Sequence, residues 1–270
     1  MPEKRIQFSV FTKPWRTLPL RELASKVSKF GFEGIELPVR PGFQVEPENA
    51  KRDLPAASML MADFGLKILS VAGSTDESTI AACAAAGVPL LRTMIAIGPE
   101  GYLASVAATQ RMFDGLLPAL ERYGVTLGVQ NHCGRYVQNA MGLKHLLEPY
   151  NPKHIAAVWD AAHNALHGEE PELALDIIWE QLALVNLKNA FWQRVNGPEA
   201  ESGVWQHYWT SGPHGLASWQ RVIAELKRRA YQGVVCLTAE YSDESSTDRL
   251  IASDLSFARK LITQESEDGS

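Results

Sequence analysis

Four short apolar runs in the second half of the chain each end in side chains that can bind a cation or move a proton. They are followed, in chain order, by Gln130 with Asn131 and His132, by Asp160 with His163, by Asn186 with Lys188, and by Glu240. Carboxylate and amide oxygens are the donors that a hard divalent cation prefers. Gathered on one rim, such donors would hold one cation, and a hydroxy-ketone substrate would complete its shell.

The run from Ile155 to Trp159 is the clearest of the four because it shows no polar alternation. Such a run is typical of a parallel strand that is covered on both faces, and Asp160 then falls where the strand leaves the core. An aspartate in this place also caps a following helix in many proteins, which would make His163 a residue of the first helical turn. The same pattern at three further strand ends favours a functional site over capping alone.

The chain as a whole alternates short apolar runs, typical of strands, with longer amphipathic runs, typical of helices. The predicted strands are residues 6–11, 34–37, 66–71, 88–97, 125–129, 155–159, 182–188 and 234–239, and helices are predicted over 18–30, 55–64, 78–86 and 102–123. This order predicts an α/β fold, a (β/α)8 TIM barrel that forms a single domain over residues 1–270. The carboxyl ends of barrel strands form the active face, so the four polar strand ends would meet there.

A doubly wound open sheet is the alternative fold. It would place a glycine-rich phosphate-binding turn after the first strand, but residues 10–15 read Val-Phe-Thr-Lys-Pro-Trp. Long loops are predicted over residues 38–49 and 191–215, and the aromatic side chains of the second either pack it onto the barrel or stack on a sugar. The polar, acidic residues 264–270 are predicted to be a disordered tail.

Composition limits the partners of this chain. Its net charge is −5 at pH 7, its pI is near 5.8, and 46% of its 270 residues are hydrophobic. A nucleic acid would demand a basic face, and no apolar stretch approaches the length of a membrane span, so we expect neither partner. The three cysteines show no CxxC spacing and indicate neither a disulfide framework nor a thiolate zinc site. With no apolar signal segment, we expect a cytoplasmic protein that binds a small solute, and assembly into a homo-oligomer is left open.

Taken together, the strand ends resemble those of the xylose-isomerase-like TIM barrels. The shared motifs are Gln130-Asn131-His132, Asp160-x-x-His163, Leu187-Lys188 and the run from Gly233 to Glu240, with Phe30 to Leu37 near the N-terminus. The resemblance covers nearly the whole chain. That superfamily includes sugar isomerases and epimerases, hydroxypyruvate isomerase, inosose dehydratase and a DNA-repair endonuclease, so the resemblance specifies the fold better than the substrate.

The resemblance implies metal ligands at Gln130, Asp160, Asn186 and Glu240, with His163 on substrate oxygens. Most members have glutamate in place of Gln130 and histidine in place of Asn186, although an amide at the latter position resembles hydroxypyruvate isomerases. An amide can ligate a hard cation but cannot accept a proton at neutral pH. Two carboxylates and two neutral amides favour Mn2+ or Mg2+ over Zn2+ as the divalent metal cofactor.

Because Gln130 cannot act as a base, we assign Glu240 as the catalytic base that removes a proton next to the substrate carbonyl. His163 or Lys188, which matches a common lysine of the family, would supply or stabilise the second proton, and the metal would stabilise an enediolate. The predicted function is a metal-assisted isomerase or epimerase acting on a small-molecule carbohydrate or hydroxy-ketone. The alternatives are a keto-sugar or inosose dehydratase on the same scaffold and a non-catalytic sugar binder with a degenerate metal site.

Six further side chains are predicted to contact substrate: Lys13, Trp15, Glu36, Arg92, His132 and Arg194. Trp15 would stack on a sugar or plug the rim, and Glu36 would bind hydroxyls or form an internal ion pair. Arg92 lies inside a strand, where its charge requires a carboxylate partner or a substrate anion. His132 would touch the ligand or orient Gln130.

Overall fold

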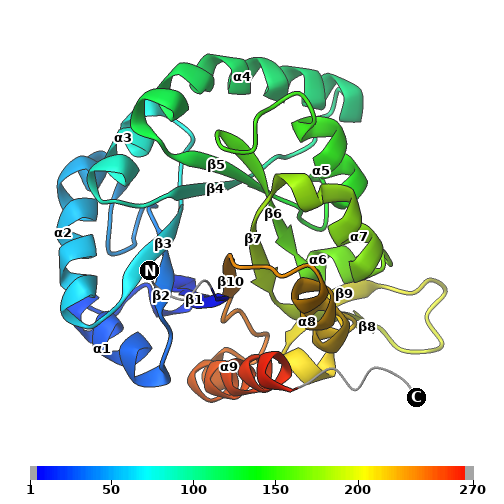
Figure 1. Cartoon of the computed structure of the whole chain (residues 1–270). Coiled ribbons are helices and arrows are strands. Elements are labelled where there is room, and N and C mark those ends of the chain that lie inside the picture. Colours follow the sequence, from blue (N-terminus) through cyan, green and yellow to red (C-terminus); the bar gives the residue numbers. More distant parts are fainter. Residues whose placement is uncertain (1–4, 265–270) are drawn as a thin grey trace.

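The computed structural model describes residues 5–264, and its centre is a closed barrel of parallel strands (Figure 1). The barrel strands are β1 (Gln7–Phe11), β2 (Gly34–Pro38), β3 (Lys67–Ala72), β4 (Leu90–Met94), β5 (Thr126–Gln130), β6 (Ile155–Asp160), β7 (Leu182–Leu187) and β10 (Val234–Leu237). Neighbours in the barrel follow the chain order, and β1 closes the ring by pairing with β10. The predicted (β/α)8 fold is confirmed, and the open doubly wound sheet is excluded.

Helices connect the strands and form the outer layer of the barrel (Figure 1). They are α1 (Leu20–Phe30), α2 (Ala50–Asp63), α3 (Glu77–Ala85), α4 (Tyr102–Tyr123), α5 (Ala140–Leu147), α6 (Ala161–Leu166), α7 (Pro171–Ile178), α8 (Trp219–Arg228) and α9 (Thr247–Thr263). Each long helix turns an apolar stripe inward. In α8, for example, Trp219, Val222 and Leu226 are buried at the three- and four-residue spacing of one helix face.

A hairpin replaces most of the loop predicted over residues 191–215. Strand β8 (Asn189–Arg194) pairs antiparallel with β9 (Trp205–Thr210) outside the barrel. Phe191 and Tyr208 are register partners whose rings stack with centroids 5.2 Å apart. Cross-strand aromatic pairs of this kind stabilise a hairpin. The aromatic residues of this segment therefore contribute to strand pairing, in addition to any contact with a ligand.

The carboxyl ends of the barrel strands meet at one rim, and their register places Asp160 and Asn186 level with each other there. Every residue of β6 is buried, as its unbroken apolar run indicates. Asp160 at its end is the register partner of Asn186 on β7, and Asn186 in turn pairs with Cys236 on β10. After β10 the chain turns at Ala239, whose φ of 53° is in the left-handed region that a side chain disfavours. Glu240 follows this strained residue directly.

The chain ends are described only in part. Residues 1–4 lie outside the described residues, as does the predicted tail 264–270 apart from Gln264, whose N–H donates to the carbonyl of Lys260 at 2.9 Å. Within residues 5–264, none of the helices combines the length and the apolar character that crossing a bilayer requires. The cytoplasmic location and the homo-oligomer stay predictions.

Candidate active site

A small cavity of about 60 Å³ opens at the carboxyl rim of the barrel. Seven of the predicted site residues line it: Lys13, Arg92, Gln130, His132, His163, Asn186 and Glu240. A wider groove of about 780 Å³ shares Lys13 and Glu240 with the cavity and has aromatic walls that include Phe43 and Trp209. Lys13 and Glu240 therefore lie between the cavity and the groove.

Arg92 on β4 organises one wall of the cavity. Its guanidinium donates to both carboxylate oxygens of Glu36, at 2.7 and 2.8 Å, and also to the amide oxygen of Gln130. Arg92 is 5% exposed and Glu36 is fully buried. Arg92 thus has the carboxylate partner that its burial requires, and Glu36 forms an internal ion pair behind the cavity.

Asp160 at the end of β6 serves both as a helix cap and as part of the site. Its Oδ1 accepts from the backbone N–H groups of Ala162 and His163, both at 3.0 Å, which caps α6. Its Oδ2 accepts from the side-chain amide of Gln130 at 2.9 Å. Burial raises the pKa of Asp160 to about 6, against the opposing charge of Lys188. Asp160 therefore fixes α6 and Gln130 from beneath the cavity.

Glu240 lies between two lysines. The ammonium of Lys188 donates to Oε2 at 2.9 Å, and that of Lys13, in the short 3₁₀ turn after β1, donates to Oε1. Burial alone would raise the pKa of Glu240, but Lys188 and Lys13 outweigh it and hold the pKa at about 2. Lys188 also lies 3.5 Å from the ring centroid of Trp209, a cation–π contact. Glu240 is thus ionised at neutral pH, and its low pKa makes it a weak base.

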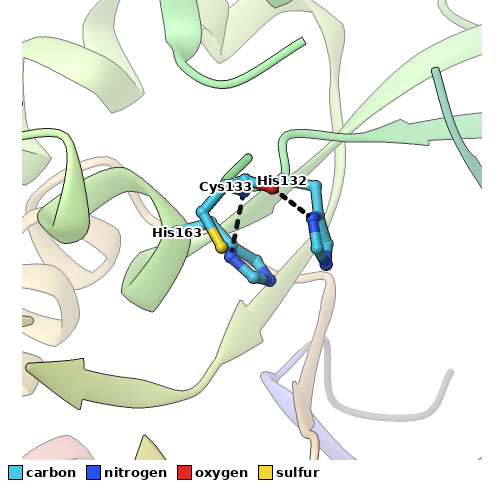
Figure 2. Close-up of side chains that lie close together, drawn as sticks. All are labelled: His132, Cys133 and His163. Carbon is cyan, nitrogen blue, oxygen red and sulfur yellow. Dashed lines mark hydrogen bonds between the residues drawn. The ribbon is translucent and has the colours of Figure 1, made fainter. Parts of the chain in front are cut away.

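Two imidazoles, those of His132 and His163, lie side by side with ring centroids 4.0 Å apart. Figure 2 shows that the backbone of Cys133 makes a hydrogen bond to each ring. Its N–H donates to Nδ1 of His163 at 3.2 Å, and its carbonyl accepts from Nδ1 of His132 at 2.7 Å. A neutral imidazole has one donor and one acceptor nitrogen. His163 therefore carries its proton on Nε2, whereas His132 keeps Nε2 free to accept one.

Both imidazoles are held neutral. Burial lowers the pKa of His132, and it lowers the pKa of His163 well below the usual value of 6.5; the charge of Lys188 contributes in each case. Nε2 of His163 lies 3.9 Å from Oδ2 of Asp160, which is too far for a direct hydrogen bond. At neutral pH the cavity wall therefore presents one nitrogen acceptor and one N–H donor.

The donor atoms of the four predicted metal ligands do not fit a divalent cation as they stand. Gln130 turns its oxygen to Arg92 and its N–H to Asp160, and both oxygens of Glu240 accept from lysine ammonium groups. The amide of Asn186 differs, because neither Oδ1 nor Nδ2 has a hydrogen-bond partner among residues 5–264 although both are buried. A cation would have to displace Arg92 and both lysines to gain these oxygens.

His132, Cys133 and His163 form a second group with metal-binding chemistry, since one donor atom from each lies within 4.8 Å of the others. Burial raises the pKa of the Cys133 thiol, whereas a metal binds the thiolate. The Nδ1 atoms of both histidines are already engaged by the Cys133 backbone. These contacts favour proton transfer over metal binding at this group.

Two predicted substrate contacts lie away from the cavity. Trp15 is 7% exposed and its indole N–H donates to Asp248 at 2.7 Å, so it borders the wide groove as a packed residue. Arg194 ends β8 and donates to Asn196 within the hairpin at 3.2 Å. Conversely, Arg40 lines the cavity and makes no ion pair within the described part of the chain, and burial and Arg92 lower its pKa. Its position two residues after β2 was the signal that it would face the rim.

The protein belongs to the class of (β/α)8 barrels, and its ionisable side chains gather at the carboxyl rim as in barrel enzymes. Within that class, residues 24–261 match the family of xylose isomerase-like TIM barrels, and the chain belongs to this family. The resemblance stated from the strand ends is thereby confirmed. Comparison with curated proteins gives no match.

Several solved structures share the fold at low sequence identity. A 3-keto-D-glucoside 4-epimerase from E. coli has a TM-score of 0.72 and 13% identity, over 95% of this chain and 100% of that one. A probable 3-DHS dehydratase from Bacillus anthracis has a TM-score of 0.71 and 15% identity, over 94% and 99%. The IolI protein, whose structure contains a bound zinc atom, has a TM-score of 0.74 and 13% identity, over 96% and 98%. Identities this low establish the fold alone.

Proposed function

We propose that this protein is an isomerase or epimerase that moves a proton on a carbon next to the carbonyl group of a sugar or small hydroxy-ketone. The observation that carries the proposal is the pair of neutral imidazoles, His132 and His163, that line one cavity with opposite tautomers. A reaction through an enediol needs one group that accepts a proton from carbon and one that donates a proton to oxygen. The two Nε2 atoms supply these two functions.

In the proposed reaction, Nε2 of His132 takes the proton from the carbon beside the carbonyl. The Nε2–H of His163 donates its proton to the carbonyl oxygen, and an enediol results. Return of the proton from the second oxygen to His163, and of the first proton from His132 to the neighbouring carbon, gives the isomerised carbonyl compound. Both histidines regain their starting tautomers, so the cycle balances without any further reactant.

Charged and amide side chains at the cavity would stabilise the developing oxyanion. Lys13 borders the cavity, and both Lys13 and Lys188 donate to the carboxylate of Glu240. The buried Nδ2 of Asn186 has no acceptor among residues 5–264, which suits a donor reserved for a substrate oxygen. Preorganised donors of this kind are worth about 100- to 1000-fold in rate each. Glu240 then acts as the group that holds both lysines, and the catalytic base is His132.

A carbohydrate is the substrate class that the surroundings favour. The cavity of about 60 Å³ is lined by amide, imidazole, ammonium and hydroxyl groups that match sugar hydroxyls. The adjoining groove, with Phe43 and Trp209, offers apolar rings for the rest of a larger sugar. The family membership and the enzymes named among the solved structures support the same class.

The test is incubation with a panel of aldoses, ketoses and keto-inositols in D2O, followed by NMR and mass spectrometry. Isomerisation or epimerisation incorporates solvent deuterium at the carbon beside the carbonyl without loss of water. Formation of an absorbing enone would instead establish the dehydratase, with the N–H of His163 protonating the leaving hydroxyl. Sugar binding without exchange or turnover would refute the enzyme assignment in favour of a sugar binder.

A further inference from the structure

We infer that this centre works without a divalent cation, because Lys13, Lys188 and Arg92 supply the positive charge that the predicted ligand set would otherwise take from a metal. A site of this kind would hold no metal whichever reaction it performs, in contrast to the metal-assisted mechanism predicted from the strand ends. Three of the four predicted ligands, Gln130, Asp160 and Glu240, already use all their side-chain polar atoms in hydrogen bonds to neighbouring residues.

Gln130 is the first of these ligands. Its oxygen accepts from Arg92, and its nitrogen donates to Oδ2 of Asp160 at 2.9 Å. This orientation aims N–H groups at the carboxylate that a metal would share with it. Flipping the amide would free Asp160 but would turn N–H groups toward the Arg92 guanidinium, which has no acceptor to offer. Gln130 therefore joins Arg92 to Asp160 as a neutral link, with no lone pair directed at a common centre.

Glu240, the second of these ligands, is occupied by two lysines. Each of its oxygens accepts from a different ammonium group, and Lys188 is 6% exposed, whereas the side chain of Glu240 is partly exposed. Two ammonium groups placed on one carboxylate deliver the charge of a divalent cation to the same two oxygens. Adding a divalent cation would bring it within a few ångströms of both ammonium groups, where like charges repel strongly in a protein.

The balance of charge around the cavity points the same way. Lys13, Lys188, Arg92 and Arg40 outnumber the carboxylates Glu36, Asp160 and Glu240, so the site is cationic before any metal is added. Protein sites for Ca2+ and Mg2+ are instead built from oxygen ligands that include negatively charged carboxylates. The buried, unpartnered amide of Asn186 is then a substrate contact, since a neutral amide alone holds no cation.

The first experiment measures metal directly. The protein, purified without chelators, is analysed for metal by mass spectrometry and then titrated calorimetrically with Mn2+, Mg2+ and Zn2+. We expect substoichiometric metal, no binding isotherm and no change in Tm with any of the three cations. Stoichiometric binding of any of them by the natural protein would overturn the inference.

Two substitutions together should create a metal site that the natural protein lacks. Lys13→Met frees Oε1 of Glu240, and Gln130→Glu replaces the amide link by a carboxylate. Combined, they should allow Mn2+ to bind and should raise Tm on its addition, with an affinity at least ten-fold above any residual binding by the natural protein. Lys26→Met, which breaks the ion pair with Asp248 outside the cavity, is the matched control and should gain nothing. Equal Mn2+ affinity in the natural protein and the double variant would contradict the assigned role of the lysine.

Discussion

The imidazoles of His132 and His163 lie 4.0 Å apart and carry opposite tautomers because one residue, Cys133, binds them both through its backbone. The backbone of a residue has one donor and one acceptor, so two neutral rings whose Nδ1 atoms bind the N–H and the C=O of the same residue must differ in the position of their proton. The acid and the base of the site are therefore fixed by backbone geometry, independently of the side chain of Cys133.

The tautomers themselves can be observed. In ¹⁵N-labelled protein at neutral pH, the nitrogen shifts of His132 should be those of a ring protonated at Nδ1, and those of His163 should be those of a ring protonated at Nε2. Cys133→Ser keeps the backbone and should leave both assignments unchanged. Finding the same tautomer in both rings would contradict the proposed division between acid and base.

Removal of the base should reduce turnover far more than binding. His132→Gln keeps a polar side chain of similar reach but cannot accept a proton at neutral pH, so kcat should fall by about 100-fold or more while KM changes little. The assay is the exchange and turnover measurement on the sugar panel. His145→Gln, on the surface of α5, is the matched control and should keep full activity. Near-normal kcat in His132→Gln would mean that the proton acceptor is another group.

The pH dependence follows from the lowered pKa values of the two imidazoles. Each must be neutral to act, and each becomes protonated only when the pH falls through its lowered pKa. The acid limb of kcat/KM should therefore lie below pH 6.5, and activity should be constant from there toward pH 8. An NMR titration of the imidazole protons gives the same pKa values without substrate. An acid limb above pH 6.5 would rule out neutral imidazoles as the reacting groups.

Glu240 should matter to stability as well as to catalysis. Glu240→Gln leaves Lys188 and Lys13 without their carboxylate. Because this group of charges is partly exposed, the free energy of unfolding should fall by about 2 kcal/mol, between the values for exposed and for buried pairs. The pKa of Glu240 is lowered from 4.5 to about 2 by folding, so its contribution is complete above pH 4.5 and is lost as the pH falls toward 2. Urea titrations of both proteins should thus converge in acid.

The control for this measurement is Glu77→Gln. Glu77 pairs with Arg122 at 3.0 Å, but both side chains are more than half exposed. An exposed pair of this kind is worth less than about 1 kcal/mol. If the two variants lost equal stability, the lysines at Glu240 would be no more tightly coupled to it than a surface pair.

The fold was predictable because its signals are local. The run Ile155 to Trp159 is apolar at every position, as a strand buried on both faces requires, and similar runs recur with helical patterns between them. The hairpin of β8 and β9 was missed because its strands show no regular alternation and lie in a segment with several glycines and prolines, which are typical of loops.

The site was predictable in position but not in chemistry. Strand ends locate Gln130, Asp160 and Asn186 at one rim, since parallel strands of a barrel end together. The contact that decides the role of Glu240 is with Lys13, which is 227 residues away in the chain. Likewise, the direction of the Gln130 amide depends on Arg92 from another strand. Such orientations arise from tertiary contacts and leave no pattern in the sequence.

Asn186 allows a final prediction that separates stability from function. Its amide is 1% exposed and neither of its polar atoms has a partner among residues 5–264, and an unsatisfied buried polar group costs about 1 to 3 kcal/mol. Asn186→Leu, which keeps the branched shape and the number of heavy atoms of the side chain, should therefore keep or raise the free energy of unfolding, by up to about 1 kcal/mol.

The same substitution should lower kcat/KM by about 100-fold, because the amide is then missing where it would meet a substrate oxygen. Asn189 provides the comparison, since its side chain bonds Gly212 and Ala217 and is fully used inside the protein. Asn189→Leu should destabilise the fold by several kcal/mol, in contrast to Asn186→Leu. Urea unfolding and steady-state kinetics on both variants distinguish the two roles. If Asn186→Leu lost stability and kept its activity, the amide would be a structural residue and would not contact the substrate.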